Sequence, residues 1–217
     1  ISSPIASYLS RLQLAPVTTI PSALAHLPHN PDVSKEIKKQ YLDKFLIGHA
    51  GALVDKHKGQ REIIKAAALL EAQAPNIHFI MLGDGPDGEQ FREESKQLSN
   101  MEWLGFKKNP GDYFAALDLF VFPSRNEGLG STLLDVMDFK VPIIASDVDG
   151  IPDIVKHEQT GLLIPVNNAD ALAAAILRLF NDKPLREQLA TTAKEKLDNF
   201  TPATMAKRYL ALYRSLL

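Results

Sequence analysis

Short runs of apolar residues alternate with segments of helical periodicity along most of the chain. The short runs are rich in β-branched and aromatic residues and end at Gly, Pro or small polar residues, which is typical of buried strands. Strands are expected at residues 45–51, 77–82, 101–104, 117–122, 142–146 and 161–164. Before them, a β-rich run at residues 17–20 is ended by Pro21.

Helices are expected between and after these strands, where apolar residues recur every three or four positions. The expected helices are a short one within residues 1–16 with its apolar residues in 7–14, then 35–42 with Ser34 as its cap, 60–74, 87–98, 109–117, 131 onward, 151–156, 169–181, 184–199 and 202–217. Residues 55–59 are expected to form a charged loop. The alternation of strand and helix predicts an α/β fold, a Rossmann-like parallel sheet covered by helices on both faces.

Residues 117–137 combine a buried strand, a glycine loop and a helix, with one carboxylate on each side of the glycines. Gly128 and Gly130 let the backbone turn tightly, and the first N–H groups of the following helix attract phosphate. Glu127 and Asp135 could then accept hydrogen bonds from hydroxyl groups on either side of a bound diphosphate. A nucleoside diphosphate sugar has hydroxyl groups on both sides of its diphosphate. The alternative is an ordinary strand, loop and helix with two solvated acids, and these residues alone do not choose between the two.

Other polar residues fall in loops that follow predicted strands, and ligands of parallel sheets bind at that edge. These loops are 49–59, 83–87, 105–109 and 124–130. Lys58 is either a point charge for a diphosphate or a solvated loop lysine. The segment Gly83-Asp84-Gly85-Pro86 has no third glycine in place for a dinucleotide fingerprint, so we interpret it as a turn.

Composition narrows the class of protein. The chain has 217 residues, a net charge of −2 and 45% hydrophobic residues, so it fits a globular domain without the basic footprint of a nucleic-acid-binding protein. It contains no Cys, which excludes disulfides and thiolate metal sites and allows a cytosolic setting. No apolar run reaches the roughly 18 residues of a membrane span. The chain begins at Ile1 with no signal-peptide pattern, so we expect a fragment of a longer protein.

Several motifs occur in the order and spacing of one enzyme family. They are Lys58-Gly59 before a helix, the segments 82–86 and 103–106, and the segments 118–130, 142–147, 150–155 and 160–165. With these motifs the chain resembles glycosyltransferase family 4, the retaining enzymes of the GT-B fold, which have two Rossmann domains. By this resemblance residues 17–200 form the donor-binding C-terminal domain. Residues 1–16 are then a remnant of a missing N-terminal domain, and residues 201–217 are a helix that crosses back to it.

The resemblance also implies roles for single residues. Glu127 contacts the donor sugar, Asp135 contacts the ribose hydroxyls, and Lys58 neutralises the diphosphate, so that Glu127 and Lys58 are the catalytic residues. Phe106 lies near the base. The implied binding residues are Lys58, Gly83, Gly85, Phe106, Glu127, Gly128, Leu129, Gly130, Ser131, Thr132 and Asp135.

Two positions depart from the family pattern. The second acid is usually Glu and here is Asp135, and the family commonly has Arg after the glycine at position 51, where this chain has Ala52. Ala52 removes one expected phosphate cation. The candidates to replace it are Lys56, Arg61 and Arg125, and the sequence does not choose among them.

The function implied is sugar transfer from a nucleoside diphosphate to a hydroxyl acceptor with retention at the anomeric carbon, in cell-surface glycan or glycolipid synthesis. We expect no metal, no other cofactor and no nucleic-acid partner. The expected setting is cytoplasmic, with any membrane contact made through the missing half, and this fragment alone is expected to be inactive. Two alternatives remain: another GT-B enzyme such as a nucleotide-sugar epimerase, and a non-catalytic sugar-nucleotide-binding module. The base, the sugar and the acceptor are not determined by the sequence.

Overall fold

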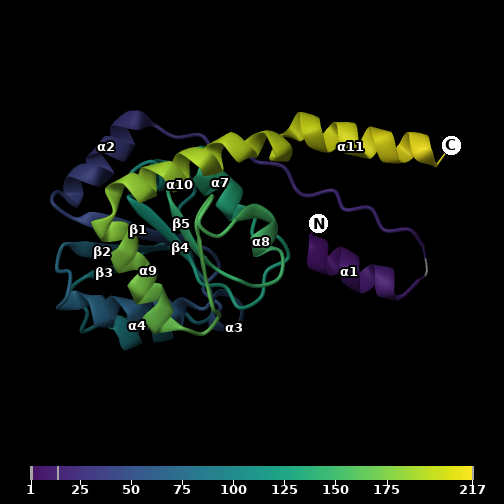
Figure 1. Cartoon of the computed structure of the whole chain (residues 1–217). Coiled ribbons are helices and arrows are strands. Elements are labelled where there is room, and N and C mark those ends of the chain that lie inside the picture. Colours follow the sequence, from purple (N-terminus) through teal and green to yellow (C-terminus); the bar gives the residue numbers. More distant parts are fainter. Residues whose placement is uncertain (1, 14, 217) are drawn as a thin grey trace.

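Six parallel strands form one sheet in the order β3-β2-β1-β4-β5-β6 (Figure 1). The computed structural model describes residues 2–13 and 15–216. The strands are β1 (Phe45–Ala50), β2 (Ile77–Leu82), β3 (Met101–Gly105), β4 (Leu119–Phe122), β5 (Ile143–Ser146) and β6 (Leu162–Ile164). This order confirms the predicted Rossmann-like α/β fold, and all six expected strands are found within one or two residues of their predicted limits.

Helices cover both faces of the sheet (Figure 1). One face carries α4 (Gln60–Glu71), α5 (Gly88–Ser95) and α9 (Ala169–Asn181). The other carries α2 (Pro31–Gln40), α6 (Gly111–Phe114), α7 (Thr132–Asp138) and α8 (Ile151–Ile154). The chain ends with α10 (Lys183–Glu195), a 3-10 helix η1 (Lys196–Phe200) and α11 (Pro202–Ser215).

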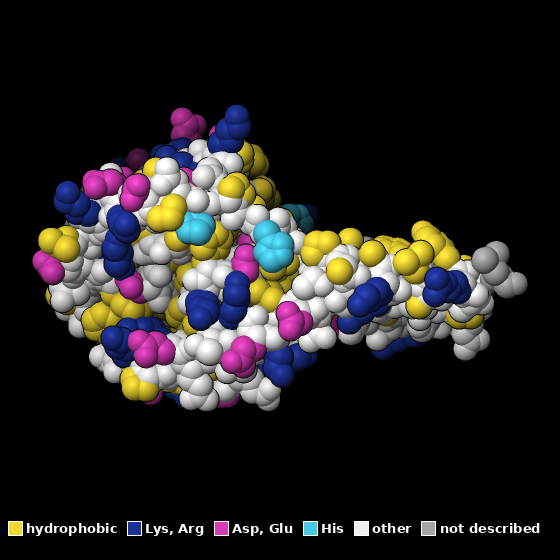
Figure 2. Space-filling model, turned by 90° about the horizontal axis from the view of Figure 1, so that it is seen from above, with side chains coloured by type: hydrophobic (Ala, Val, Ile, Leu, Met, Phe, Trp, Pro, Cys, Tyr) yellow, Lys and Arg dark blue, Asp and Glu magenta, His cyan; other side chains and the backbone are white. Residues whose placement is uncertain are grey.

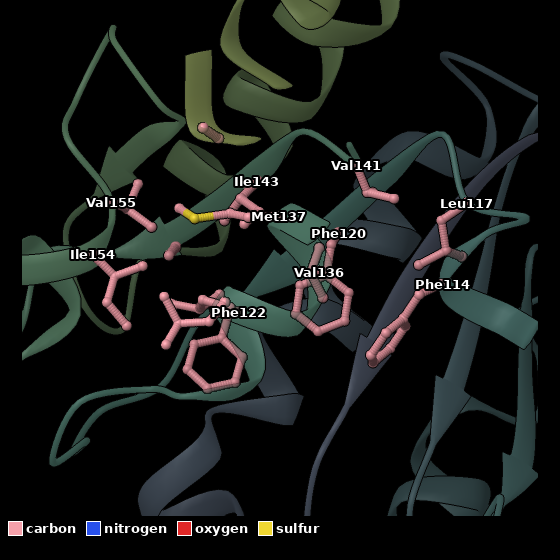
Figure 3. Packing of buried hydrophobic residues seen from close by; sticks show 14 of the residues in the cluster. Phe114, Leu117, Phe120, Phe122, Val136, Met137, Val141, Ile143, Ile154 and Val155 are labelled. Carbon is pink, nitrogen blue, oxygen red and sulfur yellow. The ribbon is translucent and has the colours of Figure 1, made fainter. Parts of the chain in front are cut away.

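The central strands are buried on both faces, which explains their continuous apolar sequences. Along β4, Phe120 and Phe122 face the helices α6, α7 and α8, whereas Leu119 and Val121 face α4 and α9. Figure 3 shows the first of these two cores, in which Phe120 and Phe122 pack with Val136 and Met137 of α7. Each fully buried side chain of this size stabilises the fold by roughly 1.5–3 kcal/mol. The sheet and α7 therefore hold the loop that connects β4 to α7 at a fixed place.

Local predictions failed where a short segment depends on distant contacts. Residues 55–59 are not simply a loop, because Asp55–Lys58 forms a one-turn helix, α3. The helix α2 is capped by Asn30, whose side chain accepts from the Asp32 N–H, and Pro31 occupies its first turn. Ser34 therefore lies inside the helix and not at its cap. The predicted helix limits at Leu14 and Leu217 lie outside the described residues.

The β-rich run at 17–20 does not form a strand. Residues 17–30 are an extended strap between α1 (Ser3–Arg11) and α2. Leu24 is buried, and its N–H donates to the carbonyl of Phe200 at 2.8 Å. The strap therefore runs beside the start of α11 and returns the chain to the sheet.

Two helices project from the sheet domain on the same side (Figure 1). Figure 2 shows hydrophobic side chains along the arm that α11 forms, with Lys and Arg beside them. Tyr209, Leu210 and Tyr213 of α11 are exposed, as are Tyr8 and Leu9 of α1. Across residues 2–13 and 15–216, no helix combines the length and the apolar composition needed to span a bilayer.

Candidate functional site

The strand order places a crevice between β1 and β4. The order in which successive strands join the sheet reverses there: β2 and β3 lie on one side of β1, whereas β4, β5 and β6 follow on its other side. Ligands of such sheets bind outside the carboxyl ends of the strands at this switch point. The loops that follow the two strands meet closely: Gly59 has a φ of +66°, and a Cβ atom there would lie 2.2 Å from the carbonyl oxygen of Pro123. Only glycine fits this approach.

Lys58 and Glu127 form an ion pair across this crevice. Lys58 ends α3 after β1, Glu127 lies in the loop after β4, and Lys58 Nζ is 2.5 Å from Glu127 Oε2. Both side chains are largely buried, with 23% and 15% of their surfaces exposed, respectively. The Lys58 ammonium also lies 5.4 Å from the centre of the Phe122 ring. The two charges that sequence analysis assigned to catalysis are therefore adjacent.

The backbone of the Glu127 loop is fixed at both ends. The N–H groups of Arg125 and Asn126 donate to the carbonyl of His57, at 2.7 and 3.3 Å. The N–H of Glu127 donates to Asp149 Oδ2 at 2.9 Å, and Gly150 N–H donates back to the carbonyl of Glu127 at 3.3 Å. The backbone of Asp149 has a φ of +48° in this position, a left-handed conformation that is strained for residues other than glycine.

After Glu127 the loop presents backbone donors. Among the hydrogen bonds of the described residues, none is donated by the N–H groups of residues 128–132. Ser131 precedes α7 and makes no side-chain capping bond. Gly128 and Ser131 are exposed, Thr132 is partly exposed, and Leu129 and Gly130 are buried. An anion that approaches the loop would find these donors and Lys58 on one side.

Asp135 lies one turn into α7 and faces the strap. Its Oδ1 accepts from the Ala25 N–H at 3.3 Å. Burial raises the pKa of Asp135 above its ordinary value, and the charge of Asp138 acts in the same direction, against the lowering by the Ala25 N–H. A hydroxyl that donated to the ionised carboxylate would offset this burial.

Two pockets adjoin the loops and share Ala52. The first, of about 650 Å³, has Lys58, Glu127 and Asp149 on one side and Ile5 and Tyr8 of α1 on the other. The second, of about 460 Å³, lies between the ends of β1 and β2. Its lining includes Leu27, Gly83, Asp84, Phe106, Thr132 and Asp135. Glu127 and Asp135 thus open into different but neighbouring pockets.

Of the remaining predicted site residues, Gly83 and Phe106 line the second pocket and Gly85 does not. Phe106 is 73% exposed at its rim. Gly83 lines the pocket, and a Cβ atom on it would lie 1.9 Å from the carbonyl oxygen of Gly51, so it brings two site loops together. Gly85 packs against the backbone of Leu53 and lines neither pocket.

The three candidates for the missing phosphate cation differ in their surroundings. Arg61 pairs with Asp55 and Glu94, and Arg125 pairs with Asp55 and Glu62. Lys56 is exposed. Both guanidinium groups are therefore committed to carboxylates of the protein.

Beneath the site, His49 is fully buried at the end of β1. Its Nδ1 lies 3.0 Å from the Val121 carbonyl, and its Nε2 lies 3.4 Å from the Gln60 amide nitrogen. Gln60 also donates to the carbonyl of Ala52 at 2.8 Å. Burial lowers the pKa of His49 to about 4, so the ring is neutral near pH 7. Its place is structural, under the loop that carries Ala52.

Among the described residues, no group of three His, Asp or Glu side chains is arranged to hold a metal ion. Independence from metal and cofactor stays a prediction. Sequence reasoning missed Ala25, Leu27 and Asp149, because each reaches the site through a contact with a distant segment. The only local signal was the acidic Asp149 before Gly150 in a loop after a strand.

Comparison with known proteins identifies the family of this chain. Residues 32–196 match the family described as "Glycosyl transferases group 1". The chain belongs to this family. The match includes the loops of Lys58 and Glu127 and the helix of Asp135.

Curated group 1 relatives are about twice as long as this chain. The lipopolysaccharide core biosynthesis glycosyltransferase LpsD of Rhizobium meliloti is 30% identical over 187 residues, which cover 84% of this chain and 53% of that protein. The capsular polysaccharide biosynthesis glycosyltransferase CapM of Staphylococcus aureus is 27% identical over 175 residues, covering 78% of this chain and 46% of CapM. The chain thus spans about half the length of these relatives.

The fold is shared with solved structures. Anabaena Alr3699/HepE, in complex with UDP and glucose, superposes with a TM-score of 0.78 at 24% identity, over 86% of this chain and 53% of HepE. At this identity the similarity supports the fold, which is that of GT-B glycosyltransferases.

Proposed function

We propose that this chain is the donor-binding domain of a retaining family 4 glycosyltransferase that transfers sugar from a nucleoside diphosphate to a hydroxyl acceptor. The observation that carries the proposal is the meeting of Lys58 and Glu127 at the switch point, 2.5 Å apart. Group 1 membership supports transfer, and the retaining outcome is taken from the resemblance to family 4.

The two pockets support a division of the donor. The nucleoside lies in the second pocket, where Asp135 accepts the ribose hydroxyls and Phe106 lies against the base. The diphosphate lies over the N–H groups of 128–132 beside Lys58, and the sugar enters the first pocket beside Glu127. Ala52, which lines both pockets, marks the place where the diphosphate would pass between them.

Negative charge grows on the diphosphate as the bond to the anomeric carbon breaks. Once the donor is bound, Lys58 and the backbone donors of 128–132 are in place before this charge appears, so they stabilise it without further reorganisation. When Lys58 turns to the phosphates, Glu127 loses its ion-pair partner and takes up the sugar hydroxyls. The ion pair of the loops thus divides into two contacts with the donor.

The acceptor side of the cleft belongs to a second domain. The relatives are about twice as long as this chain, which supports a further domain of similar size in the whole protein. The exposed apolar side chains of α11 and α1, such as Tyr213 and Tyr8, support a contact with it. The names of LpsD and CapM support a role in cell-surface glycan synthesis. The cytoplasmic setting is part of the proposal.

A binding screen tests the proposal. The 217-residue chain is titrated by calorimetry with UDP-, GDP- and ADP-sugars, and the best donor is then incubated with hydroxyl acceptors. We expect one nucleotide class to bind and to raise the melting temperature, and no glycosidic product, because the second domain is needed to exclude water. Binding of no nucleotide sugar would contradict donor binding, and repeated turnover by this chain alone would contradict the need for a second domain.

A further inference from the structure

Arg125 uses its whole guanidinium group within the protein. Its Nη1 donates to the carbonyl oxygen of Asp55 at 2.7 Å and to Asp55 Oδ2 at 2.6 Å. Its Nη2 lies 3.3 Å from Glu62 Oε1, and its Nε donates to the side chain of Asn167. Asp55 and Glu62 are almost fully buried. A guanidinium engaged on three sides by protein acceptors is a poor phosphate ligand, so Arg125 does not replace the arginine absent at Ala52.

These contacts connect the two elements that carry Lys58 and Glu127. Asp55 begins the one-turn helix α3, and Lys58 ends it. Arg125 lies two residues before Glu127, and its own N–H donates to the carbonyl of His57, which is also in α3. The helix and the loop are therefore joined twice, once through the Arg125 backbone and once through its side chain.

We propose that Arg125 is a positioning residue that holds the helix α3 of Lys58 against the loop of Glu127, and thereby sets the ion pair of the free chain and the spacing between the phosphate and sugar contacts of the bound donor. The one-turn helix is too short to be stable alone, so its place depends on such contacts. The planar guanidinium reaches Asp55 through Nη1, Glu62 through Nη2 and Asn167 through Nε at once, a fixed arrangement that a lysine ammonium cannot reproduce. The link to donor contacts rests on the proposed function, whereas the link to the ion pair does not.

The charge balance of the cluster supports a permanent connection. Burial raises the pKa of Asp55, but the Arg61 N–H and the guanidinium groups of Arg125 and Arg61 outweigh it, so the net pKa is lowered. Asp55 is therefore ionised at neutral pH, and its ion pairs persist there.

Arg61 provides a matched control. It pairs with the same Asp55 carboxylate, at 3.1 Å, but its other partners are Glu94 and the Phe91 ring of α5, and it forms no hydrogen bond or ion pair with residues 124–130. Arg61→Met thus removes a guanidinium from the same cluster and leaves the Glu127 loop untouched.

The first experiment needs no ligand. The coupling between Lys58→Met and Glu127→Gln is measured by urea unfolding in three backgrounds: the unmodified chain, Arg125→Met and Arg61→Met. In the unmodified chain we expect the effect of the double substitution on the unfolding equilibrium constant to differ by about fivefold from the product of the two single effects. In Arg125→Met the departure falls below about twofold, and in Arg61→Met it stays near fivefold.

A milder variant covers the case in which Arg125→Met does not fold. Asn167→Gly removes the Nε contact at a residue whose φ is +55°, where glycine is favourable, and it should reduce the coupling to about half. Full coupling in both variants, equal loss in Arg61→Met, or additivity in the unmodified chain would each overturn the proposal.

The second experiment uses UDP and UDP-glucose as probes. Arg125→Met should weaken UDP-glucose by about tenfold and UDP by about threefold, because only the sugar nucleotide needs both contacts at the correct spacing. Arg61→Met should change neither by more than about twofold. If the unmodified chain binds neither probe, its donor is not a uridine nucleotide, and the ligand-free coupling still decides the role of Arg125. Equal weakening by the two Arg variants would contradict it.

Discussion

Lys58 Nζ lies 2.5 Å from Glu127 Oε2, so each charge neutralises the other across the switch point of the sheet. In the proposed function, a diphosphate competes with this carboxylate for the same ammonium group. A donor must therefore give Lys58 a better partner than Glu127, and must give Glu127 hydroxyl donors in return. Two charged phosphates and a sugar satisfy both needs.

Lys58→Ala should weaken binding of a nucleoside diphosphate by about tenfold or more, since a charge-assisted contact contributes roughly 1.5–3 kcal/mol. Lys56→Ala is the control, because Lys56 is an exposed lysine of the same short helix. Titration calorimetry with UDP, GDP and ADP measures the effect. Unchanged affinity in Lys58→Ala, or an equal loss in Lys56→Ala, would rule out the diphosphate role.

Asp135→Asn and Glu127→Gln should separate the two ends of the donor. Asp135→Asn should weaken binding of the bare nucleoside diphosphate and of the intact sugar nucleotide alike, because both ligands contain the ribose. Glu127→Gln weakens only the sugar nucleotide, and the bare diphosphate binds as well or better because Lys58 is released. Competition titrations of both ligands on both variants measure this split. Equal loss of the bare diphosphate in the two variants would show that the assigned roles are wrong.

Asp149→Gly should weaken the sugar nucleotide without lowering the stability of the fold. The φ of +48° strains Asp149, and glycine relieves about 1 kcal/mol of that strain, while the Glu127 N–H loses its acceptor. We expect a threefold to tenfold loss of affinity, about 1 kcal/mol, at an unchanged or higher melting temperature. Lys140→Gly, at a φ of +56° away from both pockets, should keep full affinity. A lower melting temperature with unchanged affinity in Asp149→Gly would assign Asp149 to the fold alone.

The stability of the chain should fall with acid between about pH 6.5 and 4. Burial lowers the pKa of His49 from 6.5 to about 4 in the folded state, so the unfolded chain takes up a proton first as the pH falls. Stability from this group is complete above pH 6.5 and decreases by up to ~1.4 kcal/mol per pH unit toward pH 4. His49→Phe should lower this slope by about one proton in urea unfolding at pH 7, 6 and 5. The pKa of His78 is also lowered by burial, so some slope remains, and an unchanged slope would contradict a neutral buried His49.

The regular part of the fold was readable from the sequence because the central strands are buried on both faces and helices such as α4 and α9 are buried on one. The same periodicity located the sheet edge, and the family motifs then picked out Lys58, Glu127 and Asp135. The cap of α2 was also accessible: Pro31 prefers the first turn of a helix, which points to Asn30 as the cap in place of Ser34.

The rest depends on contacts that no local pattern records. The helix α3 has only four residues, about one helical turn, so no apolar repeat can show in it, and Asp55 holds it through partners on other elements. The run at 17–20 has the composition of a strand, but in the structure it lies alongside α11 and does not join the sheet. Asp149 reaches Glu127 from 22 positions further along the chain, and only the folded structure brings them together.

The switch-point arrangement has a consequence for how the chain acquires its site. Lys58 and Glu127 are 69 residues apart, and they meet only after β4 has paired with β1 across the intervening β2 and β3 units. Closing such a distance is a slow, non-local step of folding. The site is therefore absent from a nascent or partly folded chain, and nucleotide added during refolding would act on the final product alone, drawing the population forward without accelerating the early steps.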